Sequence, residues 1–439
     1  MKSRTSKYIT LCIFLTSVLC LTGCGQRQDI VYNTETDHIS TEKNATNENV
    51  VSLQDSLGIT DLRWDESVSV PSGEVTIRTS VLLPDTNEIY TMTATKASLT
   101  TEKKKEILNY FVDIDTVQVD VESIQTKEDI EETIKQLEND AIEHNVPKPD
   151  DIIAWYREQM DDAPLESELS YDVGDFSAEK YIGTKDNISF SFYLCEKDST
   201  GNLYIDVARE DSDSMNICYS DNHSPGNRCQ KTEEQACEEA LKICNDLGLP
   251  SMKILHSEDL YRIKFASEAN ERDEQWVEGY YIVLSRNIGD VAADLTYYYS
   301  EEDLWQSYAR NYNQEKIEIC IDDKGVLSLV ITGLLTEGTL NGKSTLLSFD
   351  KIQDIIKQEL TENNNAGDLF TSLSLQYLRI INPDNSDEFC FIPAWRMCKG
   401  RNFELYYAQP IDNVILINAI DGSIIDIGKV GLTETSLMQ

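Results

Sequence analysis

The chain has 439 residues, of which 78 are Asp or Glu and 38 are Lys or Arg, so its formal net charge at pH 7 is −40. Such a charge repels phosphate backbones and anionic lipid head groups, which argues against a nucleic-acid-binding protein and against membrane attachment through a basic patch. The length is sufficient for several domains, each with its own hydrophobic core.

Residues 1–23 have the pattern of an export signal. Lys2, Arg4 and Lys7 precede an apolar run from Tyr8 to Leu21. This run is shorter than the roughly 20 apolar residues that a membrane-spanning helix needs. The sequence therefore predicts a signal peptide.

The end of this segment, Leu21, Thr22, Gly23 and Cys24, resembles the lipobox of bacterial lipoproteins. The resemblance implies that Cys24 becomes the first residue of the mature chain and carries acyl chains such as palmitate. It also implies a place on the outer face of the cytoplasmic membrane, of the Gram-positive type, with the lipid as the anchor. The alternative is an ordinary secretory signal with an incidental cysteine.

Residues 24–73 are rich in Asn, Thr, Ser, Asp and Glu and contain few apolar side chains. A segment of this composition buries too little apolar surface to offset the entropy lost on ordering. We therefore expect a flexible polar tether with a reach of about 35 Å.

The first folded unit is expected over residues 74–215, as a mixed α+β domain. Alternating apolar residues over 75–81 and 90–94 predict a β-hairpin. Capping patterns then predict helices that begin near Thr100, Thr126 and Asp150. Strands over 188–194 and 203–207 predict a second hairpin.

Residues 216–345 and 346–439 are each expected to form a module in which one helix lies on an antiparallel sheet. The helices begin near Thr232 and Ser348, and the last hairpins turn at Asp322–Gly325 and at Asp421–Gly422. Glycine suits these turns because primed hairpin turns require a positive φ. The predicted fold class is therefore α+β, although two helix-then-sheet stretches can also resemble each other by chance.

The segments Pro393–Trp395 and Asn418–Gly422 resemble the closing strands of YycI-like and PepSY-like domains of Gram-positive cell-surface proteins. The whole chain resembles uncharacterised clostridial-type surface lipoproteins with the same order of lipobox, tether, α+β unit and two modules. The resemblance implies either restraint of a membrane sensor kinase or propeptide-like regulation of peptidases. It supplies no catalytic residue, and the transmembrane helix by which YycI-type proteins reach their kinase is not expected here.

Eight cysteines follow Cys24, and an exported protein is permitted to form disulfides. Cys237 and Cys244 lie seven residues apart in a predicted helix, about 10 Å along its axis, which is too far for a disulfide. They are therefore expected in the core. Two other pairs enclose loop-forming residues and are candidates either for short disulfides or for free thiols: Cys218 with Cys229, and Cys390 with Cys398.

Known catalytic and ligand-binding patterns are incomplete in this chain. The four histidines are isolated from one another, so neither zinc ligation nor a histidine base is expected. Ser177–Lys180 and Ser220–Asn222 resemble two of the three penicillin-binding motifs, but the Lys-Thr-Gly motif is missing. Gly338–Ser344 is one residue short of a phosphate-binding loop, and Asn382–Glu388 lacks the EF-hand order. We expect no cofactor and no metal.

Four aromatic residues are candidates for a contact surface for carbohydrate or peptide: Trp305, Tyr308, Tyr312 and Trp395. The helical spacing of the first three is also typical of side chains that pack onto a sheet. The expected function is non-catalytic binding or regulation at the cell surface, with an envelope protein or peptide as the partner, added as a strand at a sheet edge. The alternative is a cell-envelope hydrolase of glycan or peptide that uses paired carboxylates. No oligomeric state is predicted.

Overall fold

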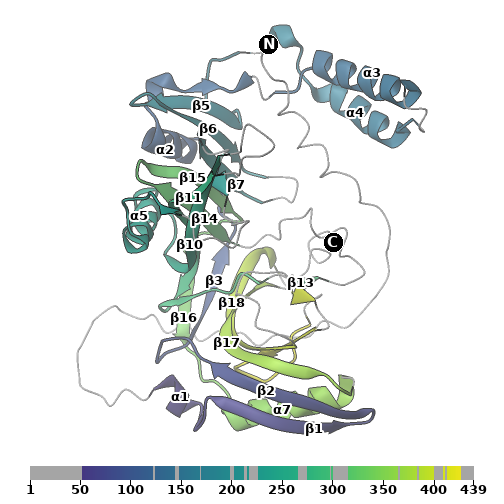
Figure 1. The fold of residues 1–439 in the computed structure, drawn as a ribbon, viewed down its shortest axis with the longest axis vertical. Coiled ribbons are helices and arrows are strands. Elements are labelled where there is room, and N and C mark those ends of the chain that lie inside the picture. Colours follow the sequence, from purple (N-terminus) through teal and green to yellow (C-terminus); the bar gives the residue numbers. More distant parts are fainter. Residues whose placement is uncertain are drawn as a thin grey trace.

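The computed structural model describes residues 52–121, 124–143, 148–168, 170–197, 202–211, 215–216, 226–264, 274–296, 298–299, 315–363, 366–382, 385–399, 409–410 and 413–426. The fold is α+β, as predicted, and is built on two mainly antiparallel sheets (Figure 1). None of the helices in these ranges is long and apolar enough to span a membrane.

The smaller sheet has the strand order β1-β2-β17-β18-β3-β16, and β20 pairs with β18 as well. Helices α1 (Leu53–Ser56) and α7 (Phe349–Asn363) contribute to its core. Its strands are β1 (Arg63–Val70), β2 (Gly73–Leu82), β3 (Tyr90–Thr95), β16 (Thr339–Lys343), β17 (Leu369–Asn382), β18 (Asn385–Lys399) and β20 (Val414–Asn418).

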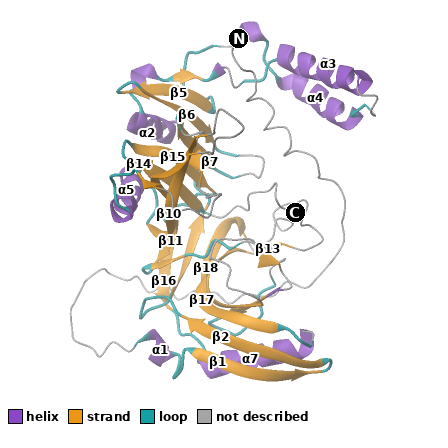
Figure 2. Cartoon of the chain, viewed as in Figure 1, coloured by secondary structure: helices purple, strands orange, loops and turns teal. Residues whose placement is uncertain are grey.

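The larger sheet has the order β4-β5-β6-β7-β15-β14-β11-β10-β8, with β9 and β12 also beside β11. Helices α2 (Thr101–Phe111) and α5 (Glu233–Asp246) lie on the same side of it (Figure 2). Its strands are β4 (Gln118–Val119), β5 (Lys180–Lys185), β6 (Ile188–Cys195), β7 (Tyr204–Arg209), β8 (Met215–Asn216), β9 (Gly226–Asn227), β10 (Met252–Lys264), β11 (Glu274–Ile288), β12 (Val291–Ala292), β14 (Lys316–Asp322) and β15 (Gly325–Thr332).

The remaining elements are short or stand apart from the two sheets. Helices α3 (Lys127–Glu143) and α4 (Asp150–Asp162) form a hairpin with its own small core around Ile130, Ile153 and Tyr156. Two 3-10 turns flank it, η3 (Ile114–Thr116) and η5 (Glu166–Glu168), and β13 (Tyr298–Tyr299) pairs in parallel with β19 (Gln409–Pro410).

The predicted helix starts are confirmed. The hydroxyl of Thr100 accepts a hydrogen bond from the backbone N–H of Lys103 at the start of α2. Thr232 and Gln235 form a capping box at the start of α5. These local patterns act within one turn of helix, so the sequence alone contains the information that they need.

The first predicted hairpin is wrong. Strand β2 pairs with β1 on one side and, in parallel, with β17 on the other. Strand β3 instead lies between β18 and β16. Alternation of apolar residues identifies a strand and its buried face, but it does not identify the neighbouring strand.

The predicted tether is also wrong over residues 52–73, which form α1, β1 and the turn into β2. Trp64, Val68 and Val70 are buried in the core of the smaller sheet. Three apolar residues among the four alternate positions 64, 66, 68 and 70 of one edge strand are enough for this burial, although the average composition of the segment is polar. Residues 24–51 lie outside the described ranges.

The predicted division at residues 215 and 345 does not follow the sheets. Residues 97–338 contain every strand of the larger sheet, while the smaller sheet combines strands from both sides of this segment. One core cluster joins Val75 and Ile77 of β2 to Phe370 of β17 and Trp395 of β18. The larger unit is therefore inserted into the smaller one.

The two predicted modules nevertheless share an order of elements. Helix α5 precedes the hairpin β10–β11, and β14 then pairs with β11. Helix α7 precedes the hairpin β17–β18, and β20 then pairs with β18. The helix-on-antiparallel-sheet plan is present in both, with β17 gaining β2 as a parallel neighbour.

Candidate functional site

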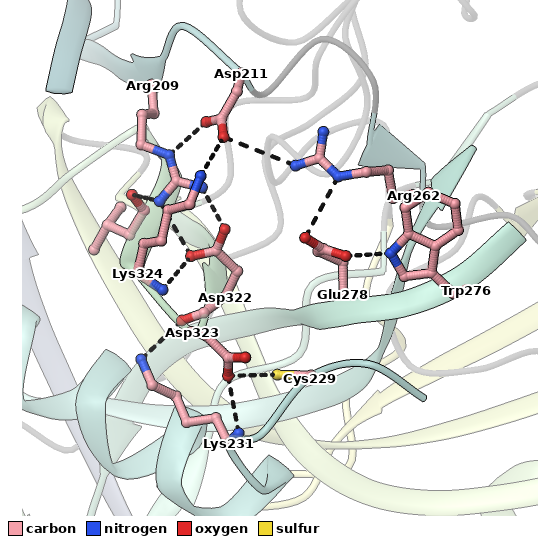
Figure 3. Close-up of polar contacts among 11 residues, drawn as sticks. Arg209, Asp211, Cys229, Lys231, Arg262, Trp276, Glu278, Asp322, Asp323 and Lys324 are labelled. Atoms are coloured by element: carbon pink, nitrogen blue, oxygen red, sulfur yellow. Dashed lines mark hydrogen bonds and ion pairs between the residues drawn. The ribbon is translucent and has the colours of Figure 1, made fainter. Parts of the chain in front are cut away.

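The turn between β14 and β15 lies in a cluster of charged side chains (Figure 3). Arg209 of β7 donates two hydrogen bonds to the carboxylate of Asp322, of which the Nη1–Oδ1 contact is 3.1 Å long. Both side chains are nearly inaccessible, with 3% and 4% of their surfaces exposed. The Nε atom of Arg209 also donates to Asp211 at 2.5 Å.

Further ion pairs extend this cluster across the sheet. Asp211 lies 3.1 Å from Lys324 and 3.8 Å from Arg262. Arg262 in turn lies 3.6 Å from Glu278, which accepts a hydrogen bond from the indole N–H of Trp276. Burial opposes ionisation of Asp211, but the hydrogen bonds from Arg209 and Lys324 outweigh it and hold its pKa below the ordinary value.

On the other side of the turn, Asp323 accepts hydrogen bonds from the backbone N–H groups of Gln230 and Lys231 and from the Cys229 thiol. These donors outweigh its slight burial and lower the pKa of Asp323. Lys231 donates to the carbonyl oxygen of Asp322 at 2.8 Å and to Glu239 of α5 at 2.6 Å. The turn is thereby joined to the start of α5.

This cluster is suited to holding the turn in place rather than to acid–base chemistry. A general acid needs a carboxyl group that keeps its proton near neutral pH. Asp211 and Asp323 instead favour the ionised form, and the pKa of Arg209 is raised because its hydrogen bonds to Asp322 and Asp211 outweigh the cost of burial.

A pocket of about 300 Å³ lies beside the start of α2 and the end of α5. Its charged lining residues are Lys103 and Glu337. The ammonium group of Lys103 already donates to Glu106 and to the carbonyl oxygen of Leu247. Most of the remaining lining is apolar: Ala97, Leu99, Leu203, Ile205, Leu249, Pro250, Leu334 and Leu335.

The face of the larger sheet opposite α2 and α5 carries many polar side chains, whereas the face under these helices is apolar. We call the partly or fully exposed part of the polar face on β5, β6, β7, β14 and β15 the open face, because none of the described helices packs on it. The same face continues in Cys195 of β6 and in Val283 and Ser285 of β11, which are buried. The strand registers place one row of side chains across it in the order Glu318, Val330, Asp206, Tyr193, Lys180. The open face comprises Lys180, Ile182, Ser191, Tyr193, Tyr204, Asp206, Ala208, Lys316, Glu318, Cys320, Ser328, Val330 and Thr332.

Asp206 is the unusual carboxyl group of this face. Burial raises its pKa above the ordinary value of 3.8, and only the Tyr204 hydroxyl counteracts this. The sequence analysis did not single out Asp206. The alternation over 188–194 and 203–207 identifies the two strands, but only their register places Asp206 beside Tyr193.

Of the predicted contact residues, Trp395 is wrong, because its side chain is fully buried and its ring centroid lies 5.5 Å from that of Phe349 in α7. It packs the helix onto the sheet. The other three predicted contact residues, Trp305, Tyr308 and Tyr312, lie outside the described ranges. So do Leu21, Thr22, Gly23 and Cys24.

The predicted Cys390–Cys398 disulfide is wrong, because both residues lie in the continuous strand β18 and are free thiols. At about 3.3 Å per residue they are far beyond bonding distance. The predicted disulfide between Cys218 and Cys229 is also wrong, because Cys229 is a free thiol; Cys218 itself lies outside the described ranges. Cys244 is buried in the core, and Cys237 packs against it, as predicted.

Several thiols have raised pKa values. Burial raises the pKa of Cys244 to about 12 and that of Cys320 to about 11. Burial and the nearby Asp323 carboxylate raise the pKa of Cys229 to about 11. In the described ranges, no group of three or more His, Cys, Asp or Glu side chains is placed to hold a metal ion.

Comparisons with known proteins give no family. No family model matches the chain, and no curated protein matches it. A solved structure of an uncharacterised protein from Eubacterium rectale is similar at 13% identity, with a TM-score of 0.36, over 85% of this chain and 98% of that one. A likeness this distant carries no argument about function.

Proposed function

We propose that this protein is a lipid-anchored extracytoplasmic protein that binds an extended peptide segment of an envelope protein, without a catalytic role. The observation that supports binding is the outer edge of β1, which ends the smaller sheet (Figure 1). An exposed strand edge presents backbone donors and acceptors to which another chain can add as a strand.

The register of β1 shows which of its backbone groups face outward. The backbone N–H of Val81 donates to the carbonyl oxygen of Leu62. The backbone N–H and C=O groups of Leu62, and of every second residue after it, therefore point toward β2. The N–H groups of Arg63, Asp65, Ser67 and Ser69 therefore point away from the sheet. Because the Arg63 and Asp65 side chains form an exposed ion pair at 2.8 Å, their charges partly neutralise each other at this edge.

The strand-addition test uses two substitutions at one position. Ser67→Pro removes an outward N–H and leaves the β1–β2 ladder intact, whereas Ser67→Ala keeps the N–H. A peptide array would be screened with the full-length chain, and retained peptides measured by calorimetry. We expect Ser67→Pro to weaken binding by roughly tenfold and Ser67→Ala to leave it nearly unchanged. Equal affinities for the two variants would contradict strand addition.

The lipid anchor is tested separately. Cells fed a palmitate analogue should label the wild-type chain and not the Cys24→Ser variant, which should also leave the membrane fraction. A labelled Cys24→Ser variant, or an unmodified thiol at Cys24 in mass spectra of the wild type, would contradict this part of the proposal.

The hydrolase alternative is favoured by one observation. Asp206 and Glu318 lie in the same row of the open face, two strands apart, which separates their backbones by about 10 Å. Inverting glycosidases place their carboxyl groups about 6.5–9.5 Å apart, and the acid has a raised pKa. Turnover of envelope glycan that disappears in Asp206→Asn would favour this alternative over non-catalytic binding.

A further inference from the structure

Three side chains of the open face lie together around one carboxyl group. Asp206 in β7 is directly opposite Tyr193 in β6, and Tyr204 lies two residues before Asp206 on the same face. The ring centroids of Tyr193 and Tyr204 are 5.5 Å apart, with 54° between the ring planes. The Tyr204 hydroxyl lies 3.5 Å from Oδ2 of Asp206. Two tilted aromatic rings thus stand beside a carboxylate.

The charges around Asp206 are not balanced by a neighbouring cation within the part of the chain that the structure describes. On one side the neighbour of Asp206 is Val330 in β15. The next residue in this row, Glu318 in β14, forms an ion pair with Lys316 at 2.9 Å. On the other side, Lys180 lies beyond Tyr193, with its ammonium nitrogen 5.5 Å from that ring centroid. Among these described neighbours, Tyr204 alone favours ionisation of Asp206, and burial opposes it.

A carboxylate beside two aromatic rings is suited to bind a cationic side chain of another protein. A carboxylate forms a charge-assisted hydrogen bond with an ammonium or guanidinium group. The faces of aromatic rings attract the same cations, as Lys180 over Tyr193 already illustrates. The methylene groups of Lys or Arg can lie against the tyrosine rings and Val330.

We propose that Asp206, Tyr193 and Tyr204 bind a Lys or Arg side chain from a basic segment of a partner protein that lies across the open face. This inference rests on the proposed binding function and names the chemistry of the partner. The net charge of −40 attracts such a segment at long range, and the three side chains give it a specific contact.

The test uses the full-length chain in detergent and a capped peptide of alternating Gly and Lys as the probe. Calorimetry should detect binding of this peptide and not of the same peptide with acetylated lysines. Asp206→Asn should weaken binding by roughly tenfold or more, and Tyr193→Ala by severalfold. Binding should also weaken as the pH falls and Asp206 takes up a proton.

A matched control variant distinguishes binding at Asp206 from nonspecific electrostatic attraction to the negatively charged chain. Glu210→Gln removes one negative charge from an exposed residue four positions after Asp206, about 13 Å away along the strand. We expect it to change the affinity by less than about twofold at physiological salt. The melting temperature of each variant would be measured, so that a loss of folding is recognised.

Three results would overturn the site: no binding of the lysine peptide, equal affinity for the acetylated peptide, or equal losses in Asp206→Asn and Glu210→Gln. A preference for a neutral oligosaccharide over the lysine peptide would also overturn it. Strand addition at β1 is tested at Ser67, a residue of the other sheet. A negative result at Asp206 with a positive one at Ser67 would therefore remove this site and leave the proposed function in place.

Discussion

At the scale of single residues, the informative groups are those whose pKa is shifted from its ordinary value. Asp206 is the clearest case, because burial raises its pKa on an otherwise neutral part of the open face. Its carboxylate is less stable in the folded chain than in water, so ionisation works against folding. This cost is absent below pH 3.8 and develops as the pH rises toward and through the raised pKa of the folded state.

Replacement of Asp206 by Asn should therefore stabilise the protein at neutral pH. We expect the melting temperature of Asp206→Asn at pH 7 to exceed that of the wild type by about 2 °C or more. The difference should shrink as the pH is lowered toward the ordinary carboxyl pKa. Scanning calorimetry from pH 4 to pH 8 would measure it, and a variant that melts lower than the wild type at pH 7 would contradict the argument.

The thiols permit a second residue-scale prediction. A pKa of about 11 at Cys229 and Cys320 leaves little reactive thiolate at pH 8. Compared with the ordinary value of 9.0, this lowers the thiolate fraction by about 100-fold. Alkylation followed by mass spectrometry should show slow modification of both residues in the native protein and rapid modification in urea. Fast native labelling at either residue would contradict the raised pKa.

At the scale of elements, the ion pair between Arg209 and Asp322 connects β7 to the turn after β14. Removal of one partner leaves a buried charge, so Arg209→Met or Asp322→Ala should each cost about 3 kcal/mol or more. The double variant should lose less than the sum of the two. Urea unfolding would give these free energies, and strictly additive losses would show that the two side chains do not act as a pair.

An exposed pair in the smaller sheet provides the control for this cycle. The Arg63 and Asp65 side chains are 2.8 Å apart but remain 65% and 47% exposed. Solvent screens such pairs, so the same cycle at these positions should give a coupling below about 1 kcal/mol. The contrast tests whether burial, rather than the short distance, makes the Arg209–Asp322 pair strong.

The elements also show which structural features could be predicted from the sequence and which could not. Helix starts at Thr100 and Thr232 were predictable, because a cap and its N–H partner lie within one turn. The pairing of β2 with β17 could not be predicted in this way, since the contact between Ile77 and the start of β17 joins residues almost 300 positions apart. The Asp206 site depends on register in the same way, and no local pattern marks it.

At the scale of the whole molecule, the larger unit is an insertion in the smaller one. Residues 97–338 contain α2, α5 and the hydrophobic cluster between them and the larger sheet. A chain of residues 97–338 expressed alone should therefore fold cooperatively, with a sharp thermal transition in circular dichroism. The predicted module 346–439 expressed alone should not, because β17 would lose β2 and the core of Val75 and Ile77. Folding of 346–439 alone would contradict the insertion.

The insertion has a consequence for biogenesis. Translation is vectorial, so β1, β2 and β3 leave the ribosome long before β17 and β18. The inserted unit can form most of its own core while these early strands still await their neighbours, although Ile288 and Ala293 pack into the core of the smaller sheet and Asp294 pairs with Arg396. Until β17 and β18 have been synthesised, the early strands expose unpaired backbone edges and apolar faces, so they need protection from aggregation during that interval.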